Sequence, residues 1–176
     1  MSWIEKYIRT IPDYPKAGIM FRDITTVFQD DVAYSKMIDQ FVEHYKDMKI
    51  DKVAGIEARG FILGGAIAYA LGVGFITMRK HGKLPHHTHK QEYTLEYGQD
   101  ALEIHKDALK GGENVLMVDD LIATGGTALA ALKLIKTAGG QVTDACFIID
   151  LPDLGGSDLL KENDCNIFTL VEYKGH

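Results

Sequence analysis

Two adjacent carboxylates followed by a loop of small residues are the part of this sequence with the clearest chemistry. Four apolar residues, 115–118, lead into Asp119 and Asp120, and Ala123-Thr124-Gly125-Gly126-Thr127 follows before a helical pattern begins. The backbone N–H groups and hydroxyls of residues 123–127 suit a phosphate at a helix N-terminus, where the helix dipole favours an anion. Carboxylates would repel that phosphate, so we expect Asp119 and Asp120 to accept hydrogen bonds from two vicinal ribose hydroxyls. The segment therefore predicts a ribose 5-phosphate site.

The alternative for this segment is an ordinary turn between a strand and a helix, in which the Asp pair caps the helix. Such turns commonly carry one or two of these features, whereas here all of them occur together. A Walker loop is not indicated, because the segment lacks Gly-Lys-Ser/Thr. We therefore favour the sugar-phosphate interpretation.

A second segment, residues 55–61, has the features of another anion site. Its sequence is Gly-Ile-Glu-Ala-Arg-Gly-Phe, which follows an apolar run and opens a helical pattern. Backbone N–H groups at such a helix start, together with the Arg59 guanidinium, could bind a second anionic group. An Arg that faces solvent at the start of a helix is the alternative.

The elements that position these segments alternate between short apolar runs and helical patterns. Runs that are apolar at every position favour strands covered by helices on both faces, so we expect an α/β fold with a mainly parallel central sheet. Ligands of such sheets gather at the carboxyl ends of the strands. The expected strands are 53–56, 74–78, 115–118, 142–149 and 167–171, and the expected helices are 31–45, 60–71 and 126–138.

Two parts of the chain depart from this alternation, although 1–176 fits a single domain by length. Residues 1–30 predict an arm, in which a short amphipathic helix from Ser2 to Arg9 is capped by Ser2 and Glu5. Residues 79–106 predict a mobile polar loop that leads into a hairpin outside the main sheet. The loop histidines are expected to be solvated, although a transition-metal site is conceivable; they are His81, His86, His87 and His89.

Composition limits the partners that we expect. With 46% hydrophobic residues, 25% charged residues and a net charge of −6, the chain has no diffuse basic surface for nucleic acid. No apolar run approaches the roughly 20 residues of a membrane span, and the N-terminus lacks a signal pattern. We expect a cytoplasmic protein without a membrane partner, in which Cys146 and Cys165 only pack.

The segment from Val115 to Thr127 closely resembles the phosphoribosyl-pyrophosphate signature of the type I phosphoribosyltransferases, in which two acidic residues precede Ala-Thr-Gly-Gly-Thr. The resemblance implies the fold of that family, with residues 1–30 as an arm and base-binding hood. It also implies that Asp119 and Asp120 bind the ribose 2′- and 3′-hydroxyls. The residues implied to enclose the 5′-phosphate are Ala123, Thr124, Gly125, Gly126 and Thr127.

The likeness to the adenine-specific members of that family runs almost end to end. Residues 18–24 resemble their base-binding segment, in which Phe21 would stack on the purine while Met20 and Arg22 shape the pocket. Leu121 is a further expected adenine contact. Taken alone, residues 18–24 could equally be an apolar loop packed on the core.

The resemblance also implies a pyrophosphate site and a catalytic loop. The expected pyrophosphate-binding residues are Glu57, Ala58, Arg59, Lys80 and Lys83, with a cis peptide between the first two. In the family the two lysines belong to a segment that reaches pyrophosphate partly across a dimer interface; taken alone they are solvated loop charges.

Leu95-Glu96-Tyr97-Gly98 resembles the catalytic-loop motif of the family. Glu96 would manage the proton near the purine N7 and Tyr97 would position the lid, so these two residues and Arg59 are the predicted catalytic residues. The alternative for Glu96 is a solvent-facing position on an exposed strand.

The resemblance implies a purine-salvage enzyme that forms AMP and pyrophosphate from adenine and phosphoribosyl pyrophosphate. It implies a homodimer, with Mg²⁺ held by substrate oxygens and water and not by protein side chains alone. Two alternatives stay open. One is a phosphoribosyltransferase for xanthine, hypoxanthine or guanine, and the other is a non-catalytic purine-sensing regulator, which the acidic chain without a spare DNA-binding domain disfavours.

Overall fold

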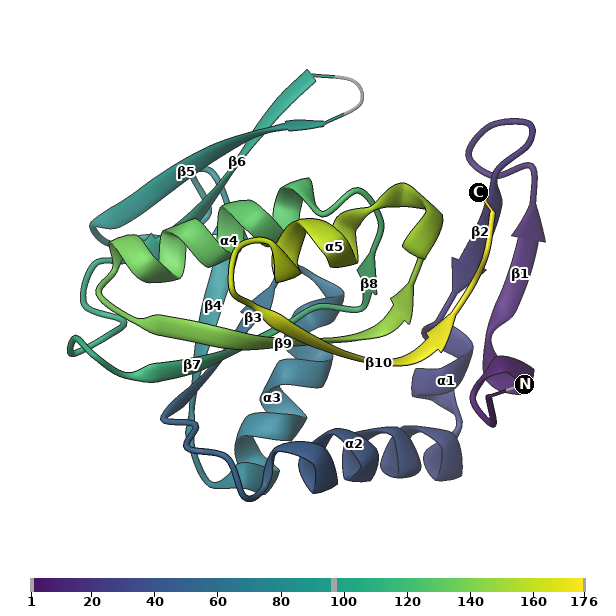
Figure 1. Cartoon of the computed structure of the whole chain (residues 1–176), viewed down its shortest axis with the longest axis horizontal. Coiled ribbons are helices and arrows are strands. Elements are labelled where there is room, and N and C mark those ends of the chain that lie inside the picture. The colour runs from purple at the N-terminus through teal and green to yellow at the C-terminus, as the bar shows by residue number, and fades with distance from the viewer. Residues whose placement is uncertain (1, 96–97, 176) are drawn as a thin grey trace.

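The computed structural model describes residues 2–95 and 98–175 and is built on one twisted sheet (Figure 1). The strands are β1 (Arg9–Pro12), β2 (Met20–Asp23), β3 (Lys52–Ile56), β4 (Gly74–Lys80), β5 (Thr88–Leu95), β6 (Gly98–His105), β7 (Asn114–Val118), β8 (Leu121–Ile122), β9 (Gln141–Asp150) and β10 (Asn166–Glu172). The helices are α1 (Thr25–Gln29), α2 (Asp31–Tyr45), α3 (Arg59–Leu71), α4 (Gly126–Thr137) and α5 (Gly156–Lys161), with 3-10 turns at Glu5–Tyr7 and Pro152–Leu154.

The main sheet has the order β10-β9-β7-β3-β4-β6-β5, and β8 pairs with β9 beside this path. The strands from β10 to β4 are parallel, whereas β6 and β5 run antiparallel to their neighbours. Parallel strands end at the same edge, so the loops after β3 and β7 leave the sheet side by side. The sheet thereby brings together the two segments with predicted chemistry.

Helices cover both faces of the sheet, as the strand pattern predicts (Figure 1). Along β7, Leu116 and Val118 pack in a core with α2 and α3. Val115 and Met117 point the other way, into a core with α4 and α5. Because both faces are buried, the strand is apolar at every position. The predicted α/β fold with a mainly parallel sheet is confirmed.

The predicted N-terminal helix is wrong. Only a 3-10 turn forms, and the chain then extends into β1, which pairs antiparallel with β2. The backbone N–H of Ser2 does donate to the Glu5 carboxylate. The Ser2 hydroxyl, however, donates to the Leu170 carbonyl at 2.9 Å, so tertiary contact with β10 replaces the expected helix cap. The β1–β2 ribbon consequently lies beside the end of the chain (Figure 1).

The predicted hairpin exists, but its predicted place outside the main sheet is wrong. β6 continues the sheet through the pairs Arg79–Glu103 and Lys80–Leu102. Leu102 and Ile104 are fully buried in the core under α4, so the base of the hairpin is packed as part of the main sheet. Strand β5 begins at Thr88, so part of the stretch predicted as loop is also strand.

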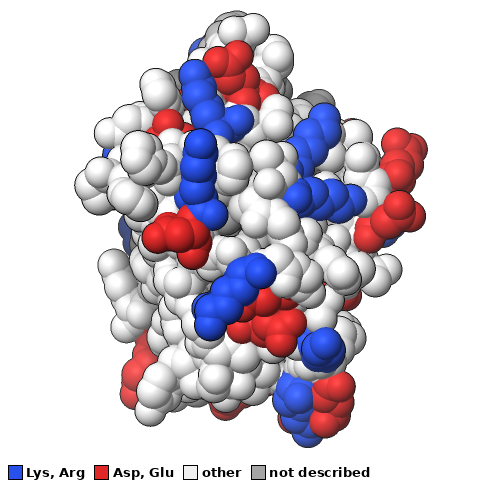
Figure 2. Space-filling model, turned by 90° about the vertical axis from the view of Figure 1, so that its left-hand side faces the viewer, with Lys and Arg blue, Asp and Glu red and all other residues white. Residues whose placement is uncertain are grey.

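Charges of both signs share the surface on one side of the molecule (Figure 2). Figure 2 shows the side that lies at the left of Figure 1, where Lys and Arg side chains stand among Asp and Glu side chains. Within residues 2–95 and 98–175, no helix has the length and apolar character needed to cross a bilayer. Cys146 and Cys165 are buried free thiols, in keeping with the predicted packing role.

Candidate active site

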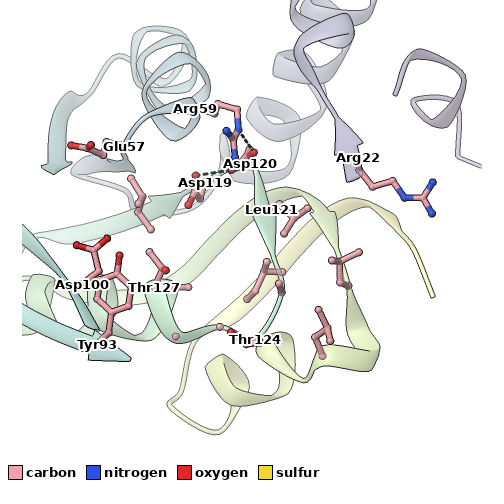
Figure 3. A pocket seen from close by; sticks show the side chains of 18 of the residues that line it. Arg22, Glu57, Arg59, Tyr93, Asp100, Asp119, Asp120, Leu121, Thr124 and Thr127 are labelled. Carbon is pink, nitrogen blue, oxygen red and sulfur yellow. Dashed lines mark hydrogen bonds and ion pairs between the residues drawn. The ribbon is translucent and has the colours of Figure 1, made fainter. Parts of the chain in front are cut away.

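A cavity of about 580 Å³ opens at the carboxyl ends of β3 and β7 (Figure 3). This volume suits a nucleotide-sized ligand. Its walls come from β2, the loop after β3, the segment from Asp119 to the first turn of α4, the hairpin and the connection after β9. The predicted site residues that line it are Met20, Phe21, Arg22, Glu57, Ala58, Arg59, Lys80, Asp119, Asp120, Leu121, Ala123, Thr124, Gly125, Gly126 and Thr127.

Three predicted site residues are not brought to the cavity by the described structure. Lys83 lies outside the lining and bonds to the Glu57 carboxylate. Glu96 and Tyr97 lie outside the described residues. The roles of these three residues stay predictions.

The two adjacent carboxylates stand in different environments. Asp120 is buried and accepts a hydrogen bond from the Arg59 Nε at 2.5 Å, while its backbone N–H donates to Asp119 Oδ1 at 2.9 Å (Figure 3). Asp119 feels the Arg59 charge more weakly, and no ion pair of its own is formed within the described residues. Burial, reinforced by the negative charge of Asp120, raises the pKa of Asp119 well above its usual value. The pair therefore offers two carboxyl groups in different environments to a ligand hydroxyl.

The turn after the carboxylates presents backbone donors to the cavity. Gly125 caps α4 with φ +81°, a left-handed conformation that glycine adopts without strain. The N–H groups in the first turn of a helix have no partner within the helix. Because residues 123–127 line the cavity, these donors, with the hydroxyls of Thr124 and Thr127, form a site for an anion.

The loop after β3 holds a basic segment in place. The peptide between Glu57 and Ala58 is cis, as the resemblance implies. The Glu57 carboxylate, whose side chain is 7% exposed, bonds to Lys83 and accepts the backbone N–H of Lys80 at 2.9 Å. Burial would raise the pKa of Glu57, but these hydrogen bonds and that of Arg79 outweigh burial and lower it. Because the Glu57 carboxylate is engaged by these partners, an anion in this part of the cavity would contact backbone groups and Arg59.

Strand β2 forms one wall of the cavity. Met20, Phe21 and Arg22 line it, and the Phe21 ring packs edge-on against Tyr14 at a centroid distance of 5.2 Å. The Arg22 guanidinium donates to Thr10 at 2.5 Å and lies 4.0 Å from the centre of the Tyr173 ring. Figure 3 shows it turned away from the carboxylates. Arg22 thus shapes the cavity wall through its backbone and side-chain stem.

Sequence reasoning missed a polar cluster on the hairpin. Tyr93 and Asp100 are cross-strand partners on β5 and β6, and both line the cavity (Figure 3). Asp100 Oδ2 lies 2.9 Å from the Lys80 Nζ, and the Tyr93 hydroxyl interacts with the side chains of Asp100 and Thr127. The strand register that pairs residues 93 and 100, and the turn of this face toward the α4 N-terminus, come from the tertiary structure.

Within the described parts of the chain, no group of three or more His, Cys, Asp or Glu side chains is placed to hold a metal ion. His81 instead contacts the buried Glu103 carboxylate, with Nδ1 and Oε1 2.6 Å apart. The rings of His86 and His87 pack together with centroids 4.9 Å apart.

Comparison with known proteins places this geometry in a family. Residues 31–170 match the family model described as the phosphoribosyl transferase domain. An adenine phosphoribosyltransferase of Rhizobium leguminosarum bv. trifolii is 57% identical over 169 residues, covering 96% of this chain and 93% of the relative. That of Rhizobium meliloti is 58% identical, with coverages of 96% and 94%. The chain belongs to the adenine phosphoribosyltransferase family.

Solved adenine phosphoribosyltransferases have the same fold. The enzyme of Thermoanaerobacter pseudethanolicus superposes with a TM-score of 0.91 at 46% identity, covering 97% of this chain and 98% of that one. The enzyme of Saccharomyces cerevisiae, in complex with an imino-altritol bisphosphate and adenine, gives 0.89 at 39% identity, with 96% of each chain covered. The type I phosphoribosyltransferase fold expected from the sequence is confirmed.

Proposed function

We propose that this chain transfers the 5-phosphoribosyl group of phosphoribosyl pyrophosphate to adenine, giving AMP and pyrophosphate for purine salvage. The observation that carries the proposal is the shared cavity. It brings an acidic pair, the amide-rich start of α4, a guanidinium and an apolar wall within one ligand-sized space. Each of these matches one part of the two substrates.

The ribose 5-phosphate part of the substrate would lie across the carboxyl end of β7. Asp119 and Asp120 accept hydrogen bonds from the ribose 2′- and 3′-hydroxyls. Residues 123–127 donate backbone and hydroxyl hydrogen bonds to the 5′-phosphate, which the α4 dipole also stabilises. In this structure Arg59 bonds to one oxygen of Asp120, and the other oxygen is available to the sugar.

The diphosphate would lie toward Arg59, Lys80 and the backbone of residues 57–59. The side chains of Arg59 and Lys80 are about half exposed, so both can turn to a diphosphate that carries more charge than their present carboxylate partners. The oxygen donors Asp119 and Asp120 also fit a nearby Mg²⁺, which would be held mainly by substrate oxygens and water. When bound, Mg²⁺ supplies positive charge against the leaving diphosphate.

The base would lie between Phe21 and the apolar wall that includes Leu121 and Leu154. In the reaction the bond between C1′ and the diphosphate oxygen breaks, N9 of the N7-protonated tautomer of adenine bonds to C1′, and adenine loses its N7 proton. Glu96 is the proposed group for managing the proton near N7, with Tyr97 positioning the lid. The cavity walls hold base and sugar in line and exclude water that would hydrolyse the activated sugar.

We further propose a homodimer formed through one face of α3. Ile62 and Tyr69 are large apolar residues with 45% and 89% of their surface exposed, and they lie seven positions apart on one helix face. Val32 of α2 is also an exposed apolar residue, at 63%. Exposed apolar patches of this kind mark association surfaces.

The test of the activity is a purine panel assayed with phosphoribosyl pyrophosphate, with and without Mg²⁺. We expect Mg²⁺-dependent AMP formation from adenine and much slower reaction of hypoxanthine, guanine and xanthine. Preference for a 6-oxo purine would assign the chain to the alternative substrate class. Sequence-specific DNA binding without turnover would instead support a regulator.

The test of the ribose site is the double substitution Asp119→Ala with Asp120→Ala. Loss of two hydrogen bonds to charged acceptors predicts a fall in kcat/KM of at least about 100-fold. The matched control is Asp47→Ala with Asp107→Ala, which removes two exposed carboxylates outside the cavity. Unchanged turnover in the cavity variant, with the control also unchanged, would refute the ribose assignment.

A further inference from the structure

The turn that leads into α5 meets the 5′-phosphate loop, residues 123–127, backbone against backbone. The Gly156 N–H donates to the Ala123 carbonyl oxygen at 2.9 Å. A Cβ built on Gly156 would lie 2.3 Å from that oxygen and 2.7 Å from the Gly125 nitrogen. From the other side, a Cβ on Gly125 would lie 2.8 Å from the Gly156 Cα. Neither position has room for a side chain, and the atoms in the way belong mostly to the backbone.

Gly156 does not line the cavity and is itself buried. It lies in a helix, so its requirement is for space and not for a left-handed conformation. Among the described residues, it meets the cavity lining at the backbone of Ala123 and Gly125 and at the Ile122 side chain. The same connection after β9 also contributes Leu151 and Leu154 to the cavity wall. One connection therefore both lines the cavity and supports the loop from behind.

We propose that Gly156 is a positioning residue for 5′-phosphate binding. The hydrogen bond from its N–H and the absence of a side chain on its Cα keep Ala123 and Gly125 at a fixed distance from α5. This distance sets the direction of the loop N–H groups before the substrate binds. The proposal rests on the proposed function of residues 123–127 as the phosphate loop. A loop of five small residues has little packing of its own, so the surface behind it decides its position.

The experiment is Gly156→Ala, assayed for steady-state kinetics and for ribose 5-phosphate binding. The added methyl must push the Ala123 carbonyl and the Gly125 amide aside, and a displacement of about 1 Å in a positioned site can cost on the order of 100-fold. We expect the KM for phosphoribosyl pyrophosphate and the Kd for ribose 5-phosphate to rise at least tenfold. The KM for adenine should change less than threefold, and kcat at saturation should fall by a smaller factor than KM rises.

Gly140→Ala is the matched control. A Cβ there would meet Leu109, Ile135 and Val115 side-chain atoms at 2.7, 2.9 and 3.2 Å, away from the cavity. This variant also crowds buried atoms, although they belong to side chains, so its Tm should fall while its KM for phosphoribosyl pyrophosphate stays within twofold of the wild type. A KM within twofold in Gly156→Ala, or an equal KM rise in both variants, would overturn the proposal.

Two further measurements separate this inference from the loop assignment. Thr127→Val should weaken ribose 5-phosphate binding; if it does not, the loop assignment fails and the role of Gly156 fails with it. If Thr127→Val weakens binding and Gly156→Ala does not, only the Gly156 role fails.

If Gly156→Ala does not fold, amide hydrogen exchange of the wild-type protein tests the role of Gly156. We expect the Gly156 N–H to exchange at least fivefold more slowly with ribose 5-phosphate than with adenine, and equal rates would overturn the proposal.

Discussion

At the scale of the residue, burial of the Asp119 carboxyl in the proposed ribose site lowers the stability of the folded protein at neutral pH. Burial and the charge of Asp120 raise its pKa in the folded protein. When a carboxyl has a higher pKa in the folded protein than in the unfolded chain, the folded protein is most stable at pH values below the pKa in the unfolded chain, near 4. Its stability then falls as the pH rises toward the pKa in the folded protein. Asp119→Asn should therefore raise Tm at pH 8 by roughly 2–4 °C, the shift for about 1 kcal/mol in a chain of this size. Thermal unfolding between pH 3.5 and pH 8 measures this difference, which should vanish at the acid end.

The same substitution should lower kcat/KM at least about tenfold, because an amide is a weaker acceptor for a ribose hydroxyl than a carboxylate. The exposed Asp107 provides the control, since Asp107→Asn should alter neither Tm nor kcat/KM. A Tm gain that is equally large at pH 3.5 and pH 8 would contradict the electrostatic origin.

At the scale of the element, two buried carboxylates hold the segment from Arg79 to Lys83 against the sheet. Glu57 holds Lys83 and the backbone of Lys80, while Glu103, only 5% exposed, contacts His81 and accepts the Gly82 N–H at 3.0 Å. Glu103→Gln should loosen this segment, because it replaces hydrogen bonds to a charged acceptor that are worth about 1.5–3 kcal/mol each. We expect trypsin to cleave after Lys80 or Lys83 at least fivefold faster, measured by mass spectrometry of the fragments.

Glu92→Gln is the control for that experiment. Glu92 lies on the same hairpin but is exposed, and its carboxylate forms an ion pair with Lys90. Its cleavage rate should equal that of the wild type. Equal rates for Glu103→Gln and Glu92→Gln would show that Glu103 does not hold the segment.

At the scale of the whole molecule, the exposed apolar face of α3 predicts association of two chains. Tyr69→Glu places a charge in the centre of the proposed interface, and burying an unpaired charge costs several kcal/mol. Analytical ultracentrifugation should therefore give the mass of two chains for the wild type and of one chain for this variant. Tyr14→Glu changes an exposed aromatic residue of the β1–β2 ribbon and should keep the dimer mass. A wild-type mass of one chain would refute the dimer.

The sequence by itself determined the features that are contiguous in the chain. Asp119, Asp120 and the loop to Thr127 are neighbours along one strand, turn and helix, so local geometry brings them together wherever the sheet lies. The uninterrupted apolar pattern of β7 similarly determined that both faces of the sheet are covered. These inferences need no knowledge of distant residues.

Only the tertiary structure decided which distant residues meet. Arg59 and Asp120 are 61 positions apart, and their ion pair exists because β3 and β7 are adjacent and end at the same edge. The hairpin residues Tyr93 and Asp100 reach the cavity because β6 pairs with β4, and the N-terminal segment became a strand because β2 offered it a partner. Strand pairing joins residues of any sequence separation, so neither periodicity nor composition encodes it locally.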